Sequence, residues 1–413
     1  MKVCAICRQY PCQELIGFGE QPICHHLLAG AETEATHPLA LGQCSSCGLV
    51  QLIDPVPPEK LVPRFDWIRY NEPEAHLDAL VERLTALPGV SKASNIGAAS
   101  FNDDSLLRRF RERGFERTWR LDQSKDLEIT VPNAGIEFVQ SKLRPSIVEY
   151  VRNQFGQPDV FIARMILEHT SETAVFLETV RTLIGSSGRV VFDVPDCSRA
   201  FDLCDYTTLW EDHTLYFTQE TFRRALTRSG FEVEWLQCFE GPYENCLVAV
   251  ARPAFKMLLN SNTEQVTAEL AQAARFAGSF AERRKAIRSE LIRWRKRGRI
   301  ALFGAGHQSV MFVNLMGIAD IVEFVVDDHP QKCGRRMPGS HLPIVTSSAL
   351  YSEEIKLCLS SLGAASEPKV IAKHQQFIQQ GGVFASIFPV RFGSAFRLLA
   401  GNAMERDGHL FVS

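Results

Sequence analysis

The chain has 413 residues, of which 45% are hydrophobic and 23% are charged. This is ordinary globular composition, which excludes a collagen-like or wholly disordered chain, and the length corresponds to roughly two to three domains. Its 45 Lys and Arg residues against 48 Asp and Glu residues leave a formal net charge of -3, which argues against a nucleic-acid binder. The sequence has no apolar run of about eighteen residues and no apolar signal-peptide core, so we expect a cytoplasmic protein with no membrane partner.

Cysteine pairs near the start of the chain predict a metal centre. Six of the 12 cysteines fall within the first 47 residues, and Cys4 with Cys7 and Cys44 with Cys47 form two C-x2-C pairs. Four thiolates close a tetrahedral shell, which is typical of structural zinc, and metal-coupled folding would stabilise a short module over residues 1–58. The remaining candidates are either rival ligands or packing and turn residues: Cys12, Cys24, His25 and His26.

An alternation of strands and helices follows and predicts a central domain over residues 59–253. A short strand and turn is expected over 91–97, further strands over 118–122, 159–163 and 188–194, and the clearest helices are 103–114 and 172–184. Strands separated by helices pair in parallel through crossovers, so the fold class is α/β with an open, doubly wound, Rossmann-like sheet. Its ligand should lie beyond the carboxyl ends of the strands.

A helical connector over residues 254–298 leads to a second sheet domain over residues 299–413. The connector carries basic residues that form either a phosphate or RNA surface or a solvated helix face. The second domain opens with a strand that ends in Gly304-Ala-Gly306, and Asp327 follows its next strand. This pattern predicts a second Rossmann-like fold with phosphate at a helix N-terminus and a carboxylate on ribose, although Ser309 replaces the third glycine.

Candidate cofactor residues lie at the predicted strand ends of the central domain. Gly97 lies in a strand-to-helix turn where a nucleotide-like cofactor would approach the backbone, and Asp122 ends the second strand, where a carboxylate can accept both ribose hydroxyls. The alternatives are that Gly97 merely ends a strand and that Asp122 caps a helix. Glu168 and His169 follow the third strand, either at the mouth of the cofactor site or as polar residues of a helix start.

An irregular segment over residues 205–218 is the richest cluster of reactive side chains. It places the acids Glu211 and Asp212 and the imidazole of His213 among aromatic residues. A neutral histidine held by an adjacent carboxylate is a competent base near neutral pH. The alternative is a buried structural histidine.

The order of these parts resembles the three-domain sugar C-methyltransferase family, which acts on nucleotide-linked keto-deoxysugars in antibiotic biosynthesis. The most specific stretch is Asp-x-x-Pro-x-Lys-x-Gly, present from Asp327, followed by Pro338-Gly339 and Pro343-Ile344. The resemblance spans nearly the whole chain. It implies an N-terminal zinc module, a central S-adenosylmethionine domain and a C-terminal Rossmann-like domain.

Three family motifs carry functional residues onto this chain. The family loop Glu-Ile-Gly-Ser-Asn-Asp-Gly corresponds to a longer stretch without the last glycine, which implies that Gly97, Asn102 and Asp103 contact the cofactor. The family motif Tyr-His-Glu-His corresponds to Trp210-Glu211-Asp212-His213, which implies that His213 is the base. The stretch from Arg164 to His169 matches the family's Leu-x-His stretch, which implies that Arg164, Glu168 and His169 lie at the cofactor's edge.

The implied reaction is methylation of a carbon next to a keto group, with S-adenosylmethionine as the methyl donor. His213, oriented by Asp212 or Glu211, would remove the proton, and the hydroxyl of Tyr70 or Tyr216 would donate to the enolate oxygen. The expected partner is a small, nucleotide-linked or similarly activated molecule. Two other functions stay open: a methyltransferase-like binding protein without catalysis, and an NAD-dependent oxidoreductase that uses the C-terminal domain.

Overall fold

The computed structural model describes residues 2–8, 10–30, 33–68, 72–241, 244–254, 263–351, 354–363, 366–389 and 397–398. The chain forms two compact units. The first contains residues 1–19, 38–199 and 211–274, and the second contains residues 20–37, 200–210 and 275–413. In the described part of the chain, no helix is both long and apolar enough to cross a membrane.

A four-stranded sheet in the order β1-β2-β3-β8 carries the N-terminal cysteines near its turns. Three of its strands come from the start of the chain: β1 (Cys12–Pro22), β2 (Thr36–Cys44) and β3 (Val50–Leu52). The fourth, β8 (Leu215–Tyr216), pairs antiparallel with the fully buried β3. The N-terminal module therefore shares a sheet with residues that follow His213.

The central sheet has the order β5-β4-β6-β7-β10-β9. Its strands are β4 (Ile96–Ala98), β5 (Thr118–Arg120), β6 (Val160–Arg164), β7 (Arg189–Asp196), β9 (Phe231–Phe239) and β10 (Asn245–Pro253). The first four in this order are parallel, whereas β10 runs antiparallel to both of its neighbours. All five residues of β6 are buried, as expected for a parallel strand that is covered on both faces.

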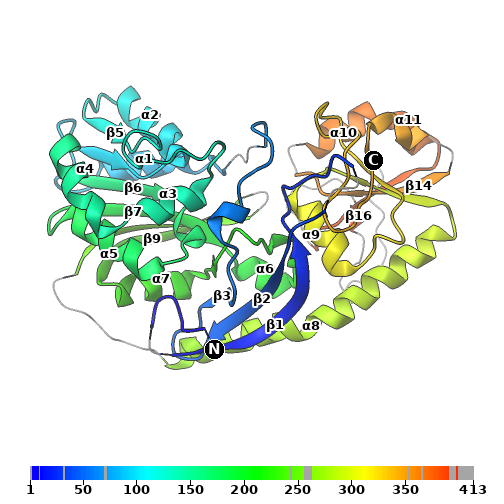
Figure 1. The fold of residues 1–413 in the computed structure, drawn as a ribbon, viewed down its shortest axis with the longest axis horizontal. Coiled ribbons are helices and arrows are strands. Elements are labelled where there is room, and N and C mark those ends of the chain that lie inside the picture. Colours follow the sequence, from blue (N-terminus) through cyan, green and yellow to red (C-terminus); the bar gives the residue numbers. More distant parts are fainter. Residues whose placement is uncertain are drawn as a thin grey trace. The chain divides into compact units, whose positions relative to one another are not determined.

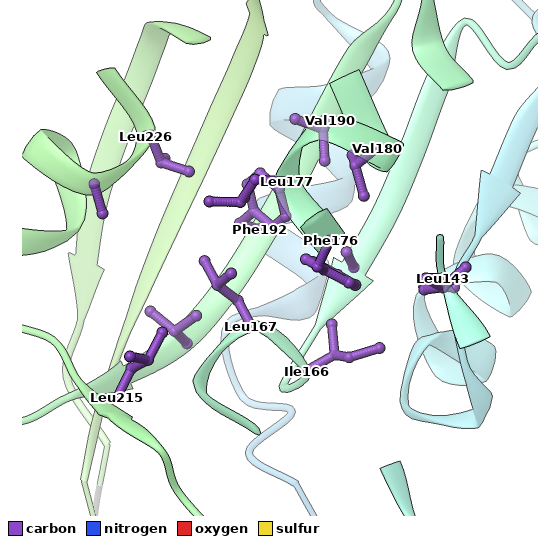
Figure 2. Close-up of a cluster of buried hydrophobic side chains, with 14 of the residues drawn as sticks. Leu143, Ile166, Leu167, Phe176, Leu177, Val180, Val190, Phe192, Leu215 and Leu226 are labelled. Atoms are coloured by element: carbon purple, nitrogen blue, oxygen red, sulfur yellow. The ribbon is translucent and has the colours of Figure 1, made fainter. Parts of the chain in front are cut away.

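Helices cover both faces of this sheet (Figure 1). They are α1 (Leu77–Thr85), α2 (Asp104–Glu112), α3 (Ile136–Lys142), α4 (Val148–Phe155), α5 (Thr173–Ile184) and α7 (Gln219–Arg228). The short helix α6 (Ser198–Leu203) follows β7 in the chain. Alternate residues of β6 enter the two cores, so Val160 packs with α1 and α2 and Phe161 packs with α5 and α7. Figure 2 shows Leu177 of α5 beside Phe192 of β7 in the second of these cores.

Short 3-10 helices connect several of these elements. They are η1 (Pro58–Lys60), η2 (Phe101–Asp103), η3 (Pro145–Ile147), η4 (Leu167–His169), η5 (Tyr206–Thr208) and η6 (Ser347–Tyr351). Two of them, η2 and η4, directly follow the carboxyl ends of β4 and β6. They therefore stand where the ligand of a doubly wound sheet binds.

The second unit contains a sheet in the order β13-β12-β11-β14-β15-β16, in which every strand pair is parallel. The strands are β11 (Arg299–Phe303), β12 (Phe324–Val326), β13 (Ile344–Val345), β14 (Ile355–Ser360), β15 (Val383–Ser386) and β16 (Arg397–Leu398). Its helices are α9 (His307–Met316), α10 (Glu367–Lys373) and α11 (Gln375–Gln379). The long helix α8 (Thr263–Arg295) precedes β11.

The predicted fold class is confirmed, because both Rossmann-like sheets and the cysteine module are present. Residues 91–97 were expected to form a short strand and turn, and the strand there, β4, occupies Ile96–Ala98. Neither β8 nor the β9-β10 hairpin, which completes the central sheet, was predicted from the sequence. Within the connector, residues 255–262 lie outside the described part, and the division into four domains remains a prediction.

Candidate active site and metal centre

The four predicted zinc ligands lie together at one end of the N-terminal sheet. The sulfur atoms of Cys4 and Cys47 are 3.7 Å apart, and those of Cys7 and Cys44 are 3.9 Å apart. Four sulfurs at about 2.3 Å from a tetrahedral Zn²⁺ would be separated by about 3.8 Å, so the observed spacing fits the ion. The rival candidates lie outside this group of four sulfurs: Cys12, Cys24, His25 and His26.

Each cysteine pair lies in a tight turn that closes with a left-handed residue. The backbone N of Arg8 donates to the carbonyl oxygen of Cys4, and that of Gly48 donates to the carbonyl oxygen of Cys44. Arg8 has φ 57° and Gly48 has φ 78°. This conformation lets the chain turn back under both thiolates. The geometry is that of a preformed structural site.

Arg164 organises the carboxyl ends of the parallel strands in the central sheet. Its side chain is fully buried, and its Nε lies 2.8 Å from Oδ2 of Asp193 at the end of β7. Its backbone N donates to Asp103, and its Nη1 donates to the carbonyl oxygen of Asn102, so both residues after β4 are fixed to β6. His76 also contacts Oδ2 of Asp193, at 2.8 Å. Three strand ends therefore meet around one buried guanidinium.

A second cluster contains the predicted base. Nδ1 of His169 lies 2.9 Å from a carboxylate oxygen of Glu137 on α3, and Nε2 lies 4.0 Å from Oε1 of Glu168. The ring of His213 meets the ring of His169 edge-on, with the centroids 4.7 Å apart. Glu168 is 1% exposed, and neither of its carboxylate oxygens has a hydrogen-bond partner among the described residues.

Backbone pairing holds His213 at this cluster. The backbone N of Thr214 donates to the carbonyl oxygen of Glu168 at 2.7 Å, and its hydroxyl lies 2.7 Å from the carbonyl oxygen of Thr170. On the other side, the backbone N of Leu52 donates to the carbonyl oxygen of Thr214. The residue after His213 is thus tied to η4 and to the N-terminal sheet at once.

Burial controls the protonation of these groups. It raises the pKa of Glu168 to about 8 and the pKa of Asp103 to about 7, and it raises the pKa of Asp212 well above its ordinary value. Burial opposes a charge on His169, but the facing carboxylate of Glu137 raises the net pKa of this imidazole. Burial therefore favours the neutral, protonated form of Glu168 near neutral pH, and the carboxylate of Glu137 favours a proton on the His169 imidazole.

The remaining predicted residues lie in different surroundings. Glu211 and Asp212 are buried, and Tyr216 is 2% exposed within β8. Oδ1 of Asp122 accepts hydrogen bonds from two backbone N–H groups of its own loop. Tyr70 lies outside the described residues.

Gly97 is a glycine because of a close approach by a side chain. A Cβ atom at this position would lie 2.4 Å from Cζ2 of Trp119. Asn95, two residues earlier, fixes the same tryptophan by accepting a hydrogen bond from its Nε1 at 2.7 Å. The indole thus occupies the space beside the turn, which explains the glycine by packing.

In the second unit, the carboxylate that was predicted to bind ribose, Asp327, accepts its hydrogen bonds from groups near its own loop. Oδ2 of Asp327 accepts hydrogen bonds from the backbone N of Ala305 and from Nζ of Lys332. Gly304 has φ 101° and lies against Ser361, where a Cβ atom would be 2.4 Å from the hydroxyl oxygen. These contacts explain the Asp-x-x-Pro-x-Lys pattern as a loop-closing motif.

Sequence reasoning missed Glu137, Asp193 and His76, which complete the two buried clusters. Asp193 has one signal in the sequence, since it is the only charged residue between the two ends of β7. Glu137 lies at the start of α3 and His76 directly precedes α1, and only the tertiary fold shows their role.

Comparisons with solved structures return methyltransferases at low similarity. A Burkholderia thailandensis 1,6-didemethyltoxoflavin-N1-methyltransferase is 15% identical over 44% of this chain and 79% of its own, with a TM-score of 0.30. A magnesium protoporphyrin IX methyltransferase from Synechocystis PCC 6803 is 14% identical over 43% of this chain and 81% of its own, with a TM-score of 0.29. No curated protein matches the chain significantly.

Three family models match successive parts of the chain and together cover most of it. Residues 4–61 match a zinc binding domain, residues 102–236 match a methyltransferase domain, and residues 248–389 match a C-methyltransferase C-terminal domain. The order is the one that the sequence motifs predicted. The first match coincides with the four clustered thiolates. The chain therefore belongs to the three-domain family of S-adenosylmethionine-dependent C-methyltransferases with a zinc-binding N-terminal module.

Proposed function

We propose that this enzyme methylates a carbon next to a keto group in a nucleotide-linked keto-deoxysugar or a similar activated small molecule, with His213 as the general base. The observation that carries the proposal is the position of His213. It lies against the buried Glu137-His169-Glu168 cluster at the carboxyl ends of the parallel strands. In a doubly wound sheet this edge is the ligand-binding edge.

The buried polar residues at the carboxyl ends of the parallel strands fit a cationic cofactor. Among the residues that the structure describes, the two buried carboxylate oxygens of Glu168 have no hydrogen-bond partner, which is rare in a folded protein unless a ligand completes the site. S-adenosylmethionine carries a positive sulfonium and an ammonium group, and when bound it supplies a methyl group open to attack by a carbon nucleophile. The positive charge of the cofactor would favour loss of the Glu168 proton on binding. Glu168, with Asp103 and Asn102 on the neighbouring loop, would then hold its charged end, and Asp122 would face its ribose.

The chain's own residues then act on the acceptor. His213 takes the acidic proton from the carbon beside the keto group, provided that the imidazole is neutral. The ring of His169 packs edge-on against the imidazole of His213, with the centroids 4.7 Å apart. Asp212 or Glu211 orients the imidazole, and the hydroxyl of Tyr70 or Tyr216 donates to the enolate oxygen.

Incubation with labelled S-adenosylmethionine and a panel of keto-sugar nucleotides tests the reaction, with mass spectrometry to detect the gain of one methylene unit. We expect His213→Asn to abolish methyl transfer and to leave cofactor binding, measured by calorimetry, nearly unchanged. His341→Asn, at a half-exposed position in the second unit, is the matched control and should retain turnover. Full turnover of His213→Asn would remove this residue from catalysis.

Calorimetry on the unsubstituted chain distinguishes an enzyme from the alternative, a methyltransferase-like binding protein without catalysis. Heat on addition of S-adenosylmethionine or S-adenosylhomocysteine supports the enzyme. No heat with either compound would favour a binding protein that has lost its cofactor site.

A further inference from the structure

Two arginines of α7 contact the two turns that hold the zinc ligands. Nη1 of Arg228 lies 2.7 Å from Sγ of Cys7 and 3.2 Å from the hydroxyl of Ser46. Its Nη2 lies 3.2 Å from the carbonyl oxygen of Ser46. One turn earlier, Nη1 of Arg224 donates to the carbonyl oxygen of Cys47 at 2.6 Å. A helix that follows the catalytic segment in sequence therefore touches both C-x2-C turns.

The contact of Arg228 differs in kind from that of Arg224, because it reaches a sulfur that would bind the metal. Four thiolates around Zn²⁺ leave a net charge of about -2. Cys4, Cys44 and Cys47 are buried and Cys7 is half-buried, so this charge is poorly solvated. A guanidinium neutralises part of it, and an N–H donor to a thiolate lowers the charge density on that sulfur.

We propose that Arg228 is an outer-sphere residue of the zinc centre, which sets zinc affinity through its contact with Cys7, so that helix α7 completes the metal site. Outer-sphere partners orient ligands and tune their basicity, and their loss typically weakens metal binding about 10- to 100-fold. The guanidinium group of Arg228 also binds Ser46, which lies between Cys44 and Cys47. One side chain thus joins the two halves of the tetrahedral shell.

Zinc affinity of the full chain, measured by competition with a chromogenic chelator, tests this proposal without any methyl-transfer assay. We expect Arg228→Gln to bind zinc about 10- to 100-fold more weakly than the unsubstituted chain. Arg223→Gln is the matched control, because Arg223 is exposed on the same helix. Equal affinity of the two variants would overturn the proposal.

Two further measurements keep the test decisive if Arg228→Gln fails to fold. Arg228→Lys keeps the positive charge but loses the guanidinium group with its two Nη donors. Its zinc affinity should fall between those of the unsubstituted chain and Arg228→Gln. An unchanged affinity of Arg228→Lys would count against the proposal. In the cobalt-substituted chain, loss of the N–H donor should shift the thiolate-to-cobalt charge-transfer band, whereas Arg223→Gln should leave it in place. An unshifted band in Arg228→Leu, whose side chain has no N–H donor, would also contradict an outer-sphere contact with the thiolate.

Discussion

The buried pair of Arg164 and Asp193 gives the sharpest prediction for stability. Both side chains are fully buried, and among the described residues Asp193 is the only carboxylate that forms an ion pair with this guanidinium. Asp193→Asn keeps the shape and leaves the guanidinium without its main counter-charge. Breaking one side of a buried pair typically costs about 3–5 kcal/mol. Asp103 contacts the Arg164 backbone and offsets part of the charge, so we expect about 3 kcal/mol.

Native-state amide exchange on β6 and β7 measures this cost where it arises. A loss of about 3 kcal/mol corresponds to exchange roughly a hundredfold faster or more for amides that open with the sheet. The matched control is Glu232→Gln, which removes a partner of Arg252 in a pair with side chains 39% and 46% exposed. Exposed pairs contribute about 0–1 kcal/mol, so the control should exchange nearly as the unsubstituted chain does.

The result that would refute this reasoning is an Asp193→Asn variant whose β6 and β7 amides exchange no faster than those of Glu232→Gln. The buried guanidinium would then be compensated by its carbonyl partners alone. The arrangement of the three strand ends around Arg164 would then not depend on the charge of Asp193, and the explanation of how they are fixed would be wrong.

Three further changes have defined outcomes. Cys44→Ser should release about one zinc ion per chain, and metal analysis that shows unchanged zinc would mean that other residues hold the ion. Burial raises the pKa of Glu168 to about 8, so the folded state keeps a proton that the unfolded state loses, and this contribution to stability declines as pH rises from about 4.5 to about 8. Thermal unfolding of Glu168→Gln should therefore lose less stability over that range than the unsubstituted chain does, and parallel curves would contradict the assignment. Gly97→Ala would press a Cβ atom against Trp119 at 2.4 Å and should cost about 1–3 kcal/mol in denaturant unfolding, whereas Gly278→Ala, with open space inside α8, should stabilise by up to about 1 kcal/mol. Equal effects of the two alanine substitutions would show that the indole of Trp119 moves aside without a measurable cost in stability.

Features that depend on local spacing could be predicted from the sequence. Cys4 and Cys7 are three residues apart, so one turn brings their sulfurs together, and the same spacing in the second pair completes the shell. The buried strand β6 is a continuous apolar run, which predicts a covered parallel strand. Both signals reside within a few neighbouring residues.

Features that depend on distant partners could not be predicted in this way. β8 has only two residues, too few for any periodicity, and it forms because β3 offers unpaired backbone groups. Glu137 reaches His169 from another helix, and nothing in its own neighbours marks that contact. Gly97 illustrates a third case, since a glycine at a strand end suggests a cofactor, whereas a tryptophan from the next strand fills the adjacent space.

The pairing of β8 with β3 also limits how the protein can be divided. A chain trimmed of its first 58 residues would lose β3, and the backbone groups of Leu215 and Tyr216 that pair with it would face solvent. The segment just beyond His213 would then be held from one side only. The cysteine module and the segment that carries His213 therefore depend on one sheet, so neither should keep its structure when the other is removed.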